Sequence, residues 1–499
     1  MRDTESVLRT KPVEDVLAQA GHPGDGSAHE GAGHRLVRRL GAKDLMGFGI
    51  GIVIGTGIFT LTGVEAKQHA GPGVVISFGI AGLVSLLAAL CYAEMASAVP
   101  TAGSAYTYAY ATIGEIFAWI IGWDLILEFA LGAAVVARGW SGYLATLFDL
   151  PPSLFKEEAT VNVGAIAIVL VLGIVAMVGI RESARVTNAL VFVKVAICTF
   201  VVVAGLFFIN RANLTPFIPP SEPVEEGTSG LAQPLSQALF GLEPTAFGFA
   251  GVLTAAAVVF FAYTGFEAVA NLGEETRNPS RDLPVGLLGT LALCTVLYMG
   301  VSFVITAMVD YRQIDESAPI ASAFDAVGAG WASVLISIAA VAGLTSVILV
   351  DIVAMGRIGF SMGRDRLLPP ALATVHPKWG TPYRITAIVI VGVALLAGLV
   401  PLGTLANLVS IGTLFAFIIV SIAVPILRRT RPDMERPFRV PFSPVIPVLS
   451  ALACLYLMTN LSIETWLRFA VWMVLGVVFY FVYGRRNARL AAKKKAPAA

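Results

Sequence analysis

The chain has 499 residues, of which 57% are hydrophobic and 13% are charged, and its formal net charge is +1. Soluble proteins carry about 25% charged residues, so this composition excludes a soluble globular protein and indicates a polytopic membrane protein. The near-zero net charge gives no indication of a nucleic-acid partner.

The N-terminal stretch 1–40 is polar and has no apolar core, so we expect no signal peptide. Residues 1–42 are therefore predicted to form a disordered cytoplasmic tail. The cysteines all lie in apolar segments, and we predict that they pack without forming a disulfide. They are Cys91, Cys198, Cys294 and Cys454.

The first apolar segment, 44–69, has Gly55, Thr56 and Gly57 at its middle. Glycine is a poor helix former, so this stretch is predicted to unwind. Unwound backbone at membrane depth is tolerated where it lines a cavity, and a helix restarting at Ile58 would direct its N–H groups at a carboxylate. From this stretch alone, a close contact between helices is an equal alternative, because small residues favour that as well.

A spanning helix needs about 20 apolar residues, and twelve segments of the sequence fit that requirement. The predicted spans are 44–69, 73–98, 112–137, 161–180, 184–209, 247–272, 285–309, 331–358, 383–400, 404–427, 444–460 and 465–484.

Lysine and arginine gather in alternate connections, which predicts the orientation in the membrane. The side that holds the N-terminus has most of them, including the basic tail 485–499. The opposite side holds Lys67, Lys156, Arg211, Arg312 and Arg468. Both termini are therefore predicted to be cytoplasmic, and the acidic, proline-rich stretch 211–245 is predicted to be extracytoplasmic.

The sixth apolar segment contains a second interruption, Thr264–Gly265, five spans after the first. The two segments cross the membrane in opposite directions. Glycine-broken segments at corresponding places in two halves indicate an inverted-repeat transporter with a site at the membrane midplane. This favours the binding-site interpretation of the first break. Helices 1–5 and 6–10 are predicted to be the repeats, within a core of residues 43–430, and helices 11–12, within 431–484, are predicted to be peripheral.

Short motifs along most of the chain resemble the amino acid–polyamine–organocation (APC) superfamily. Within it, the chain is similar to the cationic amino acid transporter family, as a bacterial member. The residues that carry the resemblance are Gly55–Phe59, Tyr92–Glu94, Pro100–Tyr106, Gly114–Glu128, Ala137–Gly142, Gly265–Glu267, Gly273–Pro279 and Met362–Pro369. The resemblance implies an all-α integral membrane protein with twelve transmembrane helices, a five-plus-five inverted-repeat (LeuT-like) fold, and helices 1 and 6 unwound at mid-membrane.

The resemblance also implies how an amino acid would bind. Its carboxylate would meet the N–H groups of Gly55, Thr56 and Gly57, with help from the Thr56 hydroxyl. Its ammonium would meet carbonyl groups left free by the two breaks, because a helix C-terminus supplies acceptors for a cation. These carbonyls belong to Val53, Ile54, Phe261, Ala262 and Thr264. The alternative for both segments is packing glycines, which we rank lower.

Lys194 lies deep in the fifth span, where a lysine is a functional residue by default. Burial disfavours its charged form, so its affinity for a proton could change as the site opens and closes. In proton-driven relatives a lysine at this place stands where sodium-driven members bind sodium. We therefore predict that Lys194 carries the coupling proton. The alternative is a fixed ammonium that holds the free carbonyls of helix 1.

Three acidic residues lie on the third helix, and Asp124 shares a face with Glu128. Either could be a partner of Lys194 or Arg138, or attract a cationic substrate. For Asp124 we favour internal pairing that buries its charge. Glu115 matches an acidic position that the family retains, and the role of Glu128 stays open.

Three further features concern gating and specificity. Glu267, after the second break, could form an inner gate with a basic residue or be a solvated charge. Phe261 is predicted to cover the substrate, whereas Phe266 and Trp123 are ranked as core. Leu344 is predicted to lie near the substrate side chain and to favour small or medium neutral substrates.

The sequence thus predicts an amino acid permease of the plasma membrane, working by alternating access with proton symport. The alternative is an exchanger or facilitator for cationic amino acids such as arginine and lysine. A channel and a membrane enzyme are ranked lower; the histidines form no HExxH-like cluster. The predicted partners are the amino acid, the proton and the lipid bilayer, with no cofactor, metal or nucleic acid; a small accessory subunit is left open.

Overall fold

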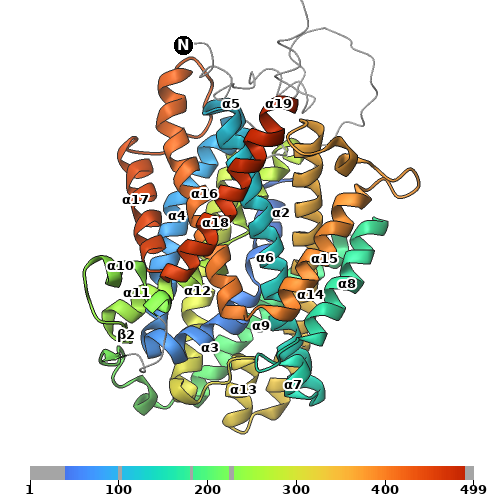
Figure 1. Cartoon of the computed structure of the whole chain (residues 1–499). Coiled ribbons are helices and arrows are strands. Elements are labelled where there is room, and N and C mark those ends of the chain that lie inside the picture. Colours follow the sequence, from blue (N-terminus) through green and yellow to red (C-terminus); the bar gives the residue numbers. More distant parts are fainter. Residues whose placement is uncertain (1–39, 99–103, 180–183, 224–229, 489–499) are drawn as a thin grey trace, which may run out of the picture.

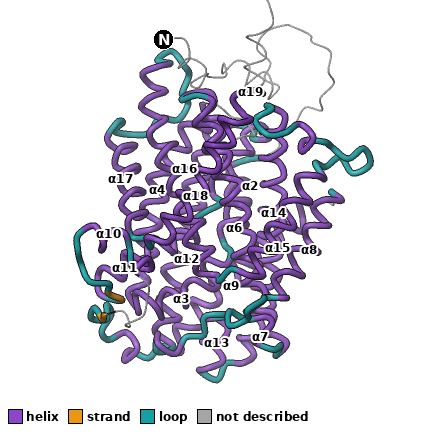
Figure 2. Tube along the Cα trace, viewed as in Figure 1, coloured by secondary structure: helices purple, strands orange, loops and turns teal. Residues whose placement is uncertain are grey.

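The structure is a computed structural model that describes residues 40–98, 104–179, 184–223 and 230–488. Nearly all of the described chain is helical (Figure 2). Its strands are the two-residue β1 (Glu222–Pro223) and β2 (Thr245–Ala246), which pair antiparallel with Glu222 opposite Ala246. The predicted tail over 1–42 and the basic tail over 485–499 lie mostly outside the described residues.

The helices follow one another in chain order, with short 3₁₀ and π segments labelled η. In the first half they are α2 (Ala42–Val53), η2 (Gly57–Leu61), α3 (Thr62–Glu65), η3 (Ala66–Ala70), η4 (Gly71–Gly73), α4 (Val74–Ala98), α5 (Ser104–Thr112), α6 (Glu115–Phe148), α7 (Pro152–Phe155), α8 (Val163–Val178), α9 (Ala184–Gly205), η5 (Leu206–Phe208), η6 (Arg211–Leu214), η7 (Gly230–Ala232) and α10 (Leu235–Leu239).

In the second half they are α11 (Gly248–Val259), η8 (Phe260–Tyr263), η9 (Phe266–Glu275), α12 (Pro279–Met308), η10 (Tyr311–Gln313), α13 (Pro319–Ala326), α14 (Gly330–Arg364), η11 (Pro370–Ala373), α15 (Tyr383–Leu399), α16 (Leu402–Thr430), α17 (Val445–Thr459), α18 (Ile463–Phe479), η12 (Tyr480–Gly484) and α19 (Arg485–Asn487).

Eight helical stretches in the described chain are long and apolar enough to cross a membrane, and α8, α15 and α17 are shorter apolar helices. Large apolar side chains remain exposed along the outer helices, for example Phe192, Val296 and Val474. Lipid tails are the environment that such side chains suit, and helices satisfy their backbone hydrogen bonds internally there. The chain is therefore a multi-pass, all-α membrane protein.

The chain leaves regular helical geometry at both places where a break is predicted. After α2 ends at Val53, Ile54 is extended, and the helix resumes at Gly57 with a π-helical turn. In the second segment Thr264 is extended and Gly265 has a φ of +95°, a backbone conformation that glycine adopts without strain.

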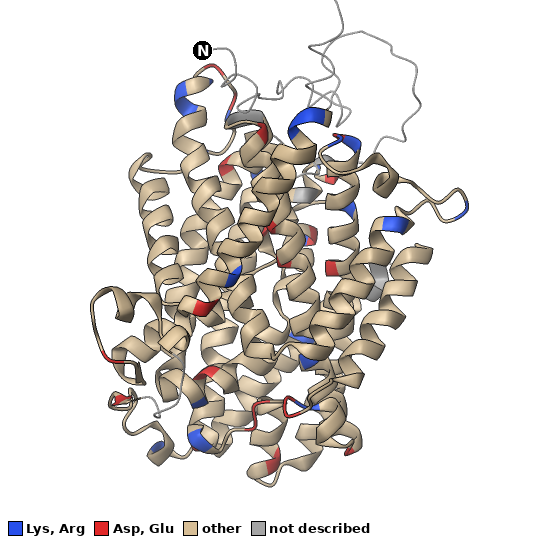
Figure 3. Ribbon diagram, viewed as in Figure 1, with Lys and Arg blue, Asp and Glu red and all other residues tan. Residues whose placement is uncertain are grey.

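The long α6 and α14 pack against each other, and α12 packs against both α4 and α2. One end of the molecule carries α5 and α19, and the other carries α7 and α13 (Figure 1). Charged side chains gather near these ends, but a few acidic positions lie midway between them (Figure 3). These buried acids are close to the two helix breaks, as described next.

Candidate functional site

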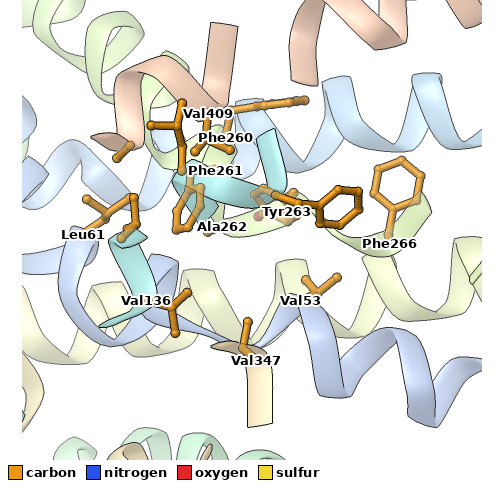
Figure 4. Packing of buried hydrophobic residues seen from close by; sticks show 14 of the residues in the cluster. Val53, Leu61, Val136, Phe260, Phe261, Ala262, Tyr263, Phe266, Val347 and Val409 are labelled. Atoms are coloured by element: carbon orange, nitrogen blue, oxygen red, sulfur yellow. The ribbon is translucent and has the colours of Figure 1, made fainter. Parts of the chain in front are cut away.

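A cavity lies between the two helix breaks, and its volume is about 430 Å³ including the part that opens to solvent. Its lining from the first break is Ile52, Val53, Gly55, Thr56 and Gly57, and from the second break Phe261, Thr264, Gly265 and Glu267. Helices α6, α14 and α16 complete the lining with Glu128, Phe129, Gly132, Val136, Val347, Asp351 and Val409. Figure 4 shows Val136 and Val347 across the first break from Phe261.

The helix that restarts after the first break offers donors to this cavity. Its first backbone hydrogen bond runs from Phe59 N to Gly55 O, at 3.3 Å. The N–H groups of Thr56, Gly57 and Ile58 precede that bond and have no partner within the helix. The Thr56 hydroxyl is fully buried, lines the cavity and has no hydrogen-bond partner. This is a preformed site for an anionic group such as a carboxylate.

Gly57 is the point of closest approach between the two broken segments. A Cβ atom built on Gly57 would lie 2.3 Å from Cα of Ala262, so a larger residue requires the backbones to separate. On the other side of the break, a Cβ on Gly139 of α6 would lie 2.7 Å from the Thr56 methyl group. Gly57 and Gly139 thus make the close contacts that the packing interpretation expects, and the binding-site interpretation of the same stretch stays a prediction.

The predicted ammonium acceptors are partly engaged by the protein itself. The Tyr298 hydroxyl donates to Val53 O at 2.6 Å, and both the N–H and the hydroxyl of Thr264 donate to Phe261 O, at 3.1 and 2.8 Å. A carbonyl oxygen can accept two hydrogen bonds, so Val53 O retains capacity for a ligand. Ile54 and Ala262 are buried but are not part of the cavity lining.

The side of the cavity away from the donors is mostly apolar. Phe129, Val136, Val347 and Val409 come from three different helices, and Phe261 lines the cavity as predicted. Leu344 is fully buried outside the lining, and Val347, one turn further along α14, takes the place expected for it. Trp123 stacks on Trp472 of α18 and so faces away from the cavity.

Three carboxylates line the cavity and are almost completely buried: Glu128, Glu267 and Asp351. Glu267 accepts the Gly265 N–H with both oxygens, each at 3.0 Å, so it caps the helix that restarts there. No ion pair joins it to a basic residue among those described. Within the described chain, no three acidic, histidine or cysteine side chains are arranged to hold a metal ion.

Lys194 is fully buried and lies outside the main cavity. Its ammonium donates to Gly51 O at 2.5 Å, in the last turn of α2, and its chain passes Gly343 of α14. It lines a second cavity of about 310 Å³ together with Phe48, Gly51, Ile52, Leu190, Val191, Ser346 and Val350. Lys194 therefore joins α9 to the end of α2, one turn before the first break.

The other predicted charge partners lie elsewhere. Glu115 is buried at the start of α6 and accepts from the Tyr110 and Tyr480 hydroxyls, at 3.1 and 2.9 Å. Arg138 pairs with Glu157 at 2.8 Å, so it is not a partner of either helix-three acid inside the membrane. Asp124 is fully buried, and neither of its oxygens has a hydrogen-bond partner among the described residues. The internal pairing that we expected for Asp124 is therefore wrong.

Packing and hydrogen bonds hold the helix after the first break and the loop before α13 in place. The Tyr143 hydroxyl of α6 donates to Phe59 O at 2.6 Å, which ties the helix after the first break to α6. Lys67 pairs with Glu316 at 3.3 Å and donates to Ile314 O at 3.2 Å, which fixes the start of the loop before α13. The second cavity, beside Lys194, lies on the opposite side of the first break.

An apolar membrane bundle with two interrupted helices around a polar cavity is the architecture of a transporter. Comparison with known families agrees: the family model described as amino acid permease matches residues 40–480. The chain therefore belongs to the amino acid permease family of the APC superfamily, and it is a transporter and not an enzyme.

Individual relatives agree along nearly the whole chain. It is 40% identical over 495 residues to the methylthioribose transporter of Bacillus subtilis, covering 97% of this chain and 99% of that one. It is 41% identical over 500 residues to the branched-chain amino acid permease BcaP of the same organism, with the same coverage. It is 33% identical over 563 residues to the chloroplastic cationic amino acid transporter 9 of Arabidopsis thaliana, covering 97% of this chain and 93% of that one.

Several cavity residues carry no signal in the sequence. Phe129, Val136 and Val409 are apolar residues in apolar helices, so nothing in the pattern distinguishes them from residues facing lipid. Asp351 did carry a signal, because an acidic residue inside an apolar span is a functional residue by default. It lines the cavity.

Proposed function

We propose that the protein is a secondary active permease that takes up amino acids across the plasma membrane by proton symport. The observation that carries this proposal is the first break, where unpaired N–H groups and the unpartnered Thr56 hydroxyl face a cavity. A carboxylate is the group that these donors fit. The remaining acceptor capacity of Val53 O, and the carboxylates beyond it, fit an ammonium.

The finer architecture is part of the same proposal. Twelve spanning helices would form two inverted repeats, helices 1–5 and 6–10, with α17 and α18 peripheral. Both termini would be cytoplasmic, which puts α5 and α19 inside and α7 and α13 outside (Figure 1). The proposal rests on the distribution of Lys and Arg and on the two breaks, which lie in segments of opposite direction.

The preferred substrates would be neutral amino acids with a medium apolar side chain. The apolar lining by Val136, Val347 and Val409 supports this, since a buried valine favours aliphatic groups over charged ones. The relative named a branched-chain amino acid permease points in the same direction.

A second candidate is exchange or facilitated transport of cationic amino acids. Glu128 and Asp351 favour it, because carboxylates lining a cavity attract a guanidinium or ammonium group. The relatives named cationic amino acid transporters support this second candidate.

Uptake into proteoliposomes distinguishes these candidates. Labelled leucine and alanine would be supplied with and without an inward proton gradient, while unlabelled arginine, lysine and glutamate compete. The proposal expects gradient-stimulated uptake that arginine does not inhibit. Competition by arginine without a pH effect would favour the second candidate and overturn proton symport of neutral substrates.

Lys194 would carry the coupling proton. When protonated, its ammonium would hold the end of α2 through Gly51 O, and loss of the proton would release α2 and let the site open. Lys194→Ala would abolish gradient-driven accumulation while counter-flow exchange of labelled leucine persists. Unchanged accumulation in Lys194→Ala would overturn the proton-carrier role. It would favour the alternative, in which Lys194 is a fixed ammonium that holds the carbonyls of helix 1.

A further inference from the structure

Asp124 is the least compensated charge-bearing group in the described membrane interior. It lies on α6 between Glu115, at the first turn, and Glu128, at the cavity. Its carboxyl group is fully buried, and both oxygens lack a hydrogen-bond partner. An isolated ionised carboxylate in such surroundings is strongly disfavoured. With no cation paired to it, the group is accommodated as a neutral acid, which requires a bound proton.

Helix α16 leaves room for this group. A Cβ atom built on Gly412 would lie 2.9 Å from Asp124 Oδ1, so a glycine is required where the carboxyl group meets the α16 backbone. The adjacent Thr413 hydroxyl is also fully buried and has no hydrogen-bond partner. It lies beside the Glu128 carboxyl group, on the side of Asp124 that leads to the cavity.

The Tyr92 hydroxyl of α4 lies near these groups. It is fully buried, has no hydrogen-bond partner among the described residues, and lies within electrostatic reach of Asp124, Glu128, Glu267 and Tyr108. Glu267 and Glu128 lie beside each other at the cavity. Buried polar atoms that lack partners are commonly bridged by ordered water. Polar groups without a partner among the described residues thus cluster between the main cavity and Asp124.

We infer that Asp124 is a proton-binding site that exchanges its proton with Glu128 through the Tyr92 hydroxyl. In each exchange Tyr92 accepts the proton of the Asp124 acid and donates its own to the Glu128 carboxylate. Asp124 becomes a carboxylate, Glu128 becomes an acid, and Tyr92 ends as it began. The site is separate from Lys194, which lies on α9 and contacts the other side of the first break.

Among the described residues around Asp124 there is no basic side chain that could neutralise the charge of an ionised carboxylate. Facing it or its route are Glu128 on α6 itself, Tyr92 from α4, Glu267 from η9 and Tyr108 from α5. Helix α16 presents Gly412 and Thr413, which do not titrate. Asp351 of α14 reaches the same cavity beside Gly132, and α18 packs on α6 through the uncharged Trp472.

Infrared spectroscopy of the purified full-length protein tests the bound proton without depending on transport. The difference spectrum between wild type and Asp124→Asn should contain the carbonyl stretch of a protonated carboxylic acid at neutral pH. In Tyr92→Phe, which keeps the ring against Phe266 and Phe417, this band should remain but should no longer change when leucine is added. Absence of the band from the difference spectrum would overturn the inference.

Transport tests the exchange, which rests on the proposed function. Asp124→Asn and Tyr92→Phe should keep counter-flow exchange of leucine and lose most of the pH dependence of net uptake, with fewer protons entering per substrate. Retention of the wild-type pH profile in both variants would overturn exchange through Tyr92. A wild type that shows the leucine-sensitive band but no proton-driven uptake would support the proton site and overturn symport, so the two failures are distinguishable.

Discussion

At the scale of single residues, the site depends on small side chains that carry no chemistry of their own. Gly57 lets the two broken segments touch, and Gly139 makes room for Thr56. In the proposed site, threonine and glycine together would give a donor set that any amino acid could use, since the carboxylate is common to all of them. Changes at these positions should therefore affect every substrate alike.

Gly57→Ala is expected to weaken binding of all substrates. The added methyl group would overlap Ala262, and overpacking of this kind costs about 1–3 kcal/mol or displaces the backbone that binds the carboxylate. Competition by unlabelled leucine and alanine in uptake assays measures the loss. The matched control is Gly392→Ala in α15, where a Cβ would meet nothing within 4 Å. A loss confined to one substrate class would contradict recognition by the backbone.

Thr56→Val tests the hydroxyl separately from the backbone. Valine keeps the shape of threonine and removes a buried hydroxyl that has no protein partner. If the substrate carboxylate uses this hydroxyl, affinity should fall about 10- to 150-fold, because a hydrogen bond to a charged group contributes about 1.5–3 kcal/mol. Unchanged affinity with increased thermal stability would show that the hydroxyl is only an uncompensated polar group.

At this scale the sequence predicted the features that depend directly on residue type, such as the conformation of the backbone. Glycine and threonine in the middle of apolar segments identified both breaks, and Thr56 and Phe261 line the cavity. It failed where the answer depends on which face of a helix points inward. Val347 and Leu344 differ by one turn only, and Asp124 and Glu128 share a helix face, although Glu128 lines the cavity and Asp124 meets Gly412 of α16.

At the scale of elements, Glu94 of α4 holds the end of α16 and the loop after it. Its carboxylate accepts from Arg428 Nε and Nη2, at 2.9 and 2.6 Å, and from Val440 N at 2.7 Å. The Arg436 guanidinium lies 3.8 Å away and donates to the Leu427 and Arg431 carbonyls that end α16. One buried acid thus fixes a helix terminus and a loop to a different helix.

Glu94→Ala should destabilise the protein strongly. Removing one partner of a buried ion pair leaves the other charge uncompensated and costs about 3–5 kcal/mol. The fall in melting temperature of the purified protein in detergent measures the effect. The control is Glu464→Ala, because its pair with Arg468 is 45% and 41% exposed and such pairs contribute little. Equal effects of the two variants would contradict the role of Glu94 as a buried anchor.

Helix α18 is attached to α6 by tryptophans. Trp119 Nε1 donates to Gly476 O at 2.8 Å and Trp123 Nε1 to Trp472 O at 2.9 Å, with stacked rings between them. The apolar pattern of residues 465–484 predicted the span but not this attachment, because a tryptophan in an apolar helix is also typical of the lipid interface.

At the scale of the whole molecule, the helix after the first break is held against α6 beside the main cavity. The Tyr143 hydroxyl donates to Phe59 O, and Gly139 lets Thr56 approach α6 closely. The second cavity lies beside Lys194 and the end of α2 that precedes the first break. The alternating-access proposal requires this arrangement to reverse during transport.

Cysteine accessibility tests this asymmetry. In a variant lacking the native cysteines, Ser346→Cys should react with a membrane-impermeant thiol reagent from the cytoplasmic side, because Ser346 lines the second cavity and is half-buried. Thr60→Cys, buried behind Tyr143, should be protected in the absence of substrate. Labelling of Thr60→Cys and protection of Ser346→Cys would show that the resting state faces the opposite side.

The sequence predicted the number and positions of the helices better than it predicted the residues that form the site. Twelve apolar segments and two breaks follow from hydropathy and glycine content, and the helices begin and end within a few residues of the predicted spans for most of them. The largest difference is at α6, which runs to Phe148, eleven residues past its predicted end, since small and aromatic residues there give no stop signal. Which segments touch is a property of the packed molecule, and no single segment encodes it.

The two broken segments are also joined by main-chain bonds at the start of the first and the end of the second: Leu40 N donates to Glu275 O at 3.0 Å, and Arg277 N donates to Leu40 O at 2.9 Å. Under the proposed alternating access, two broken helices that opened independently would pass through mixed arrangements in which ions could leak without substrate. A joint between them would make the two helices move as one body and would suppress those leak states. These two bonds use only main-chain atoms, so most substitutions at Leu40 or Arg277 would preserve them. Proline is the exception, because it has no N–H to donate.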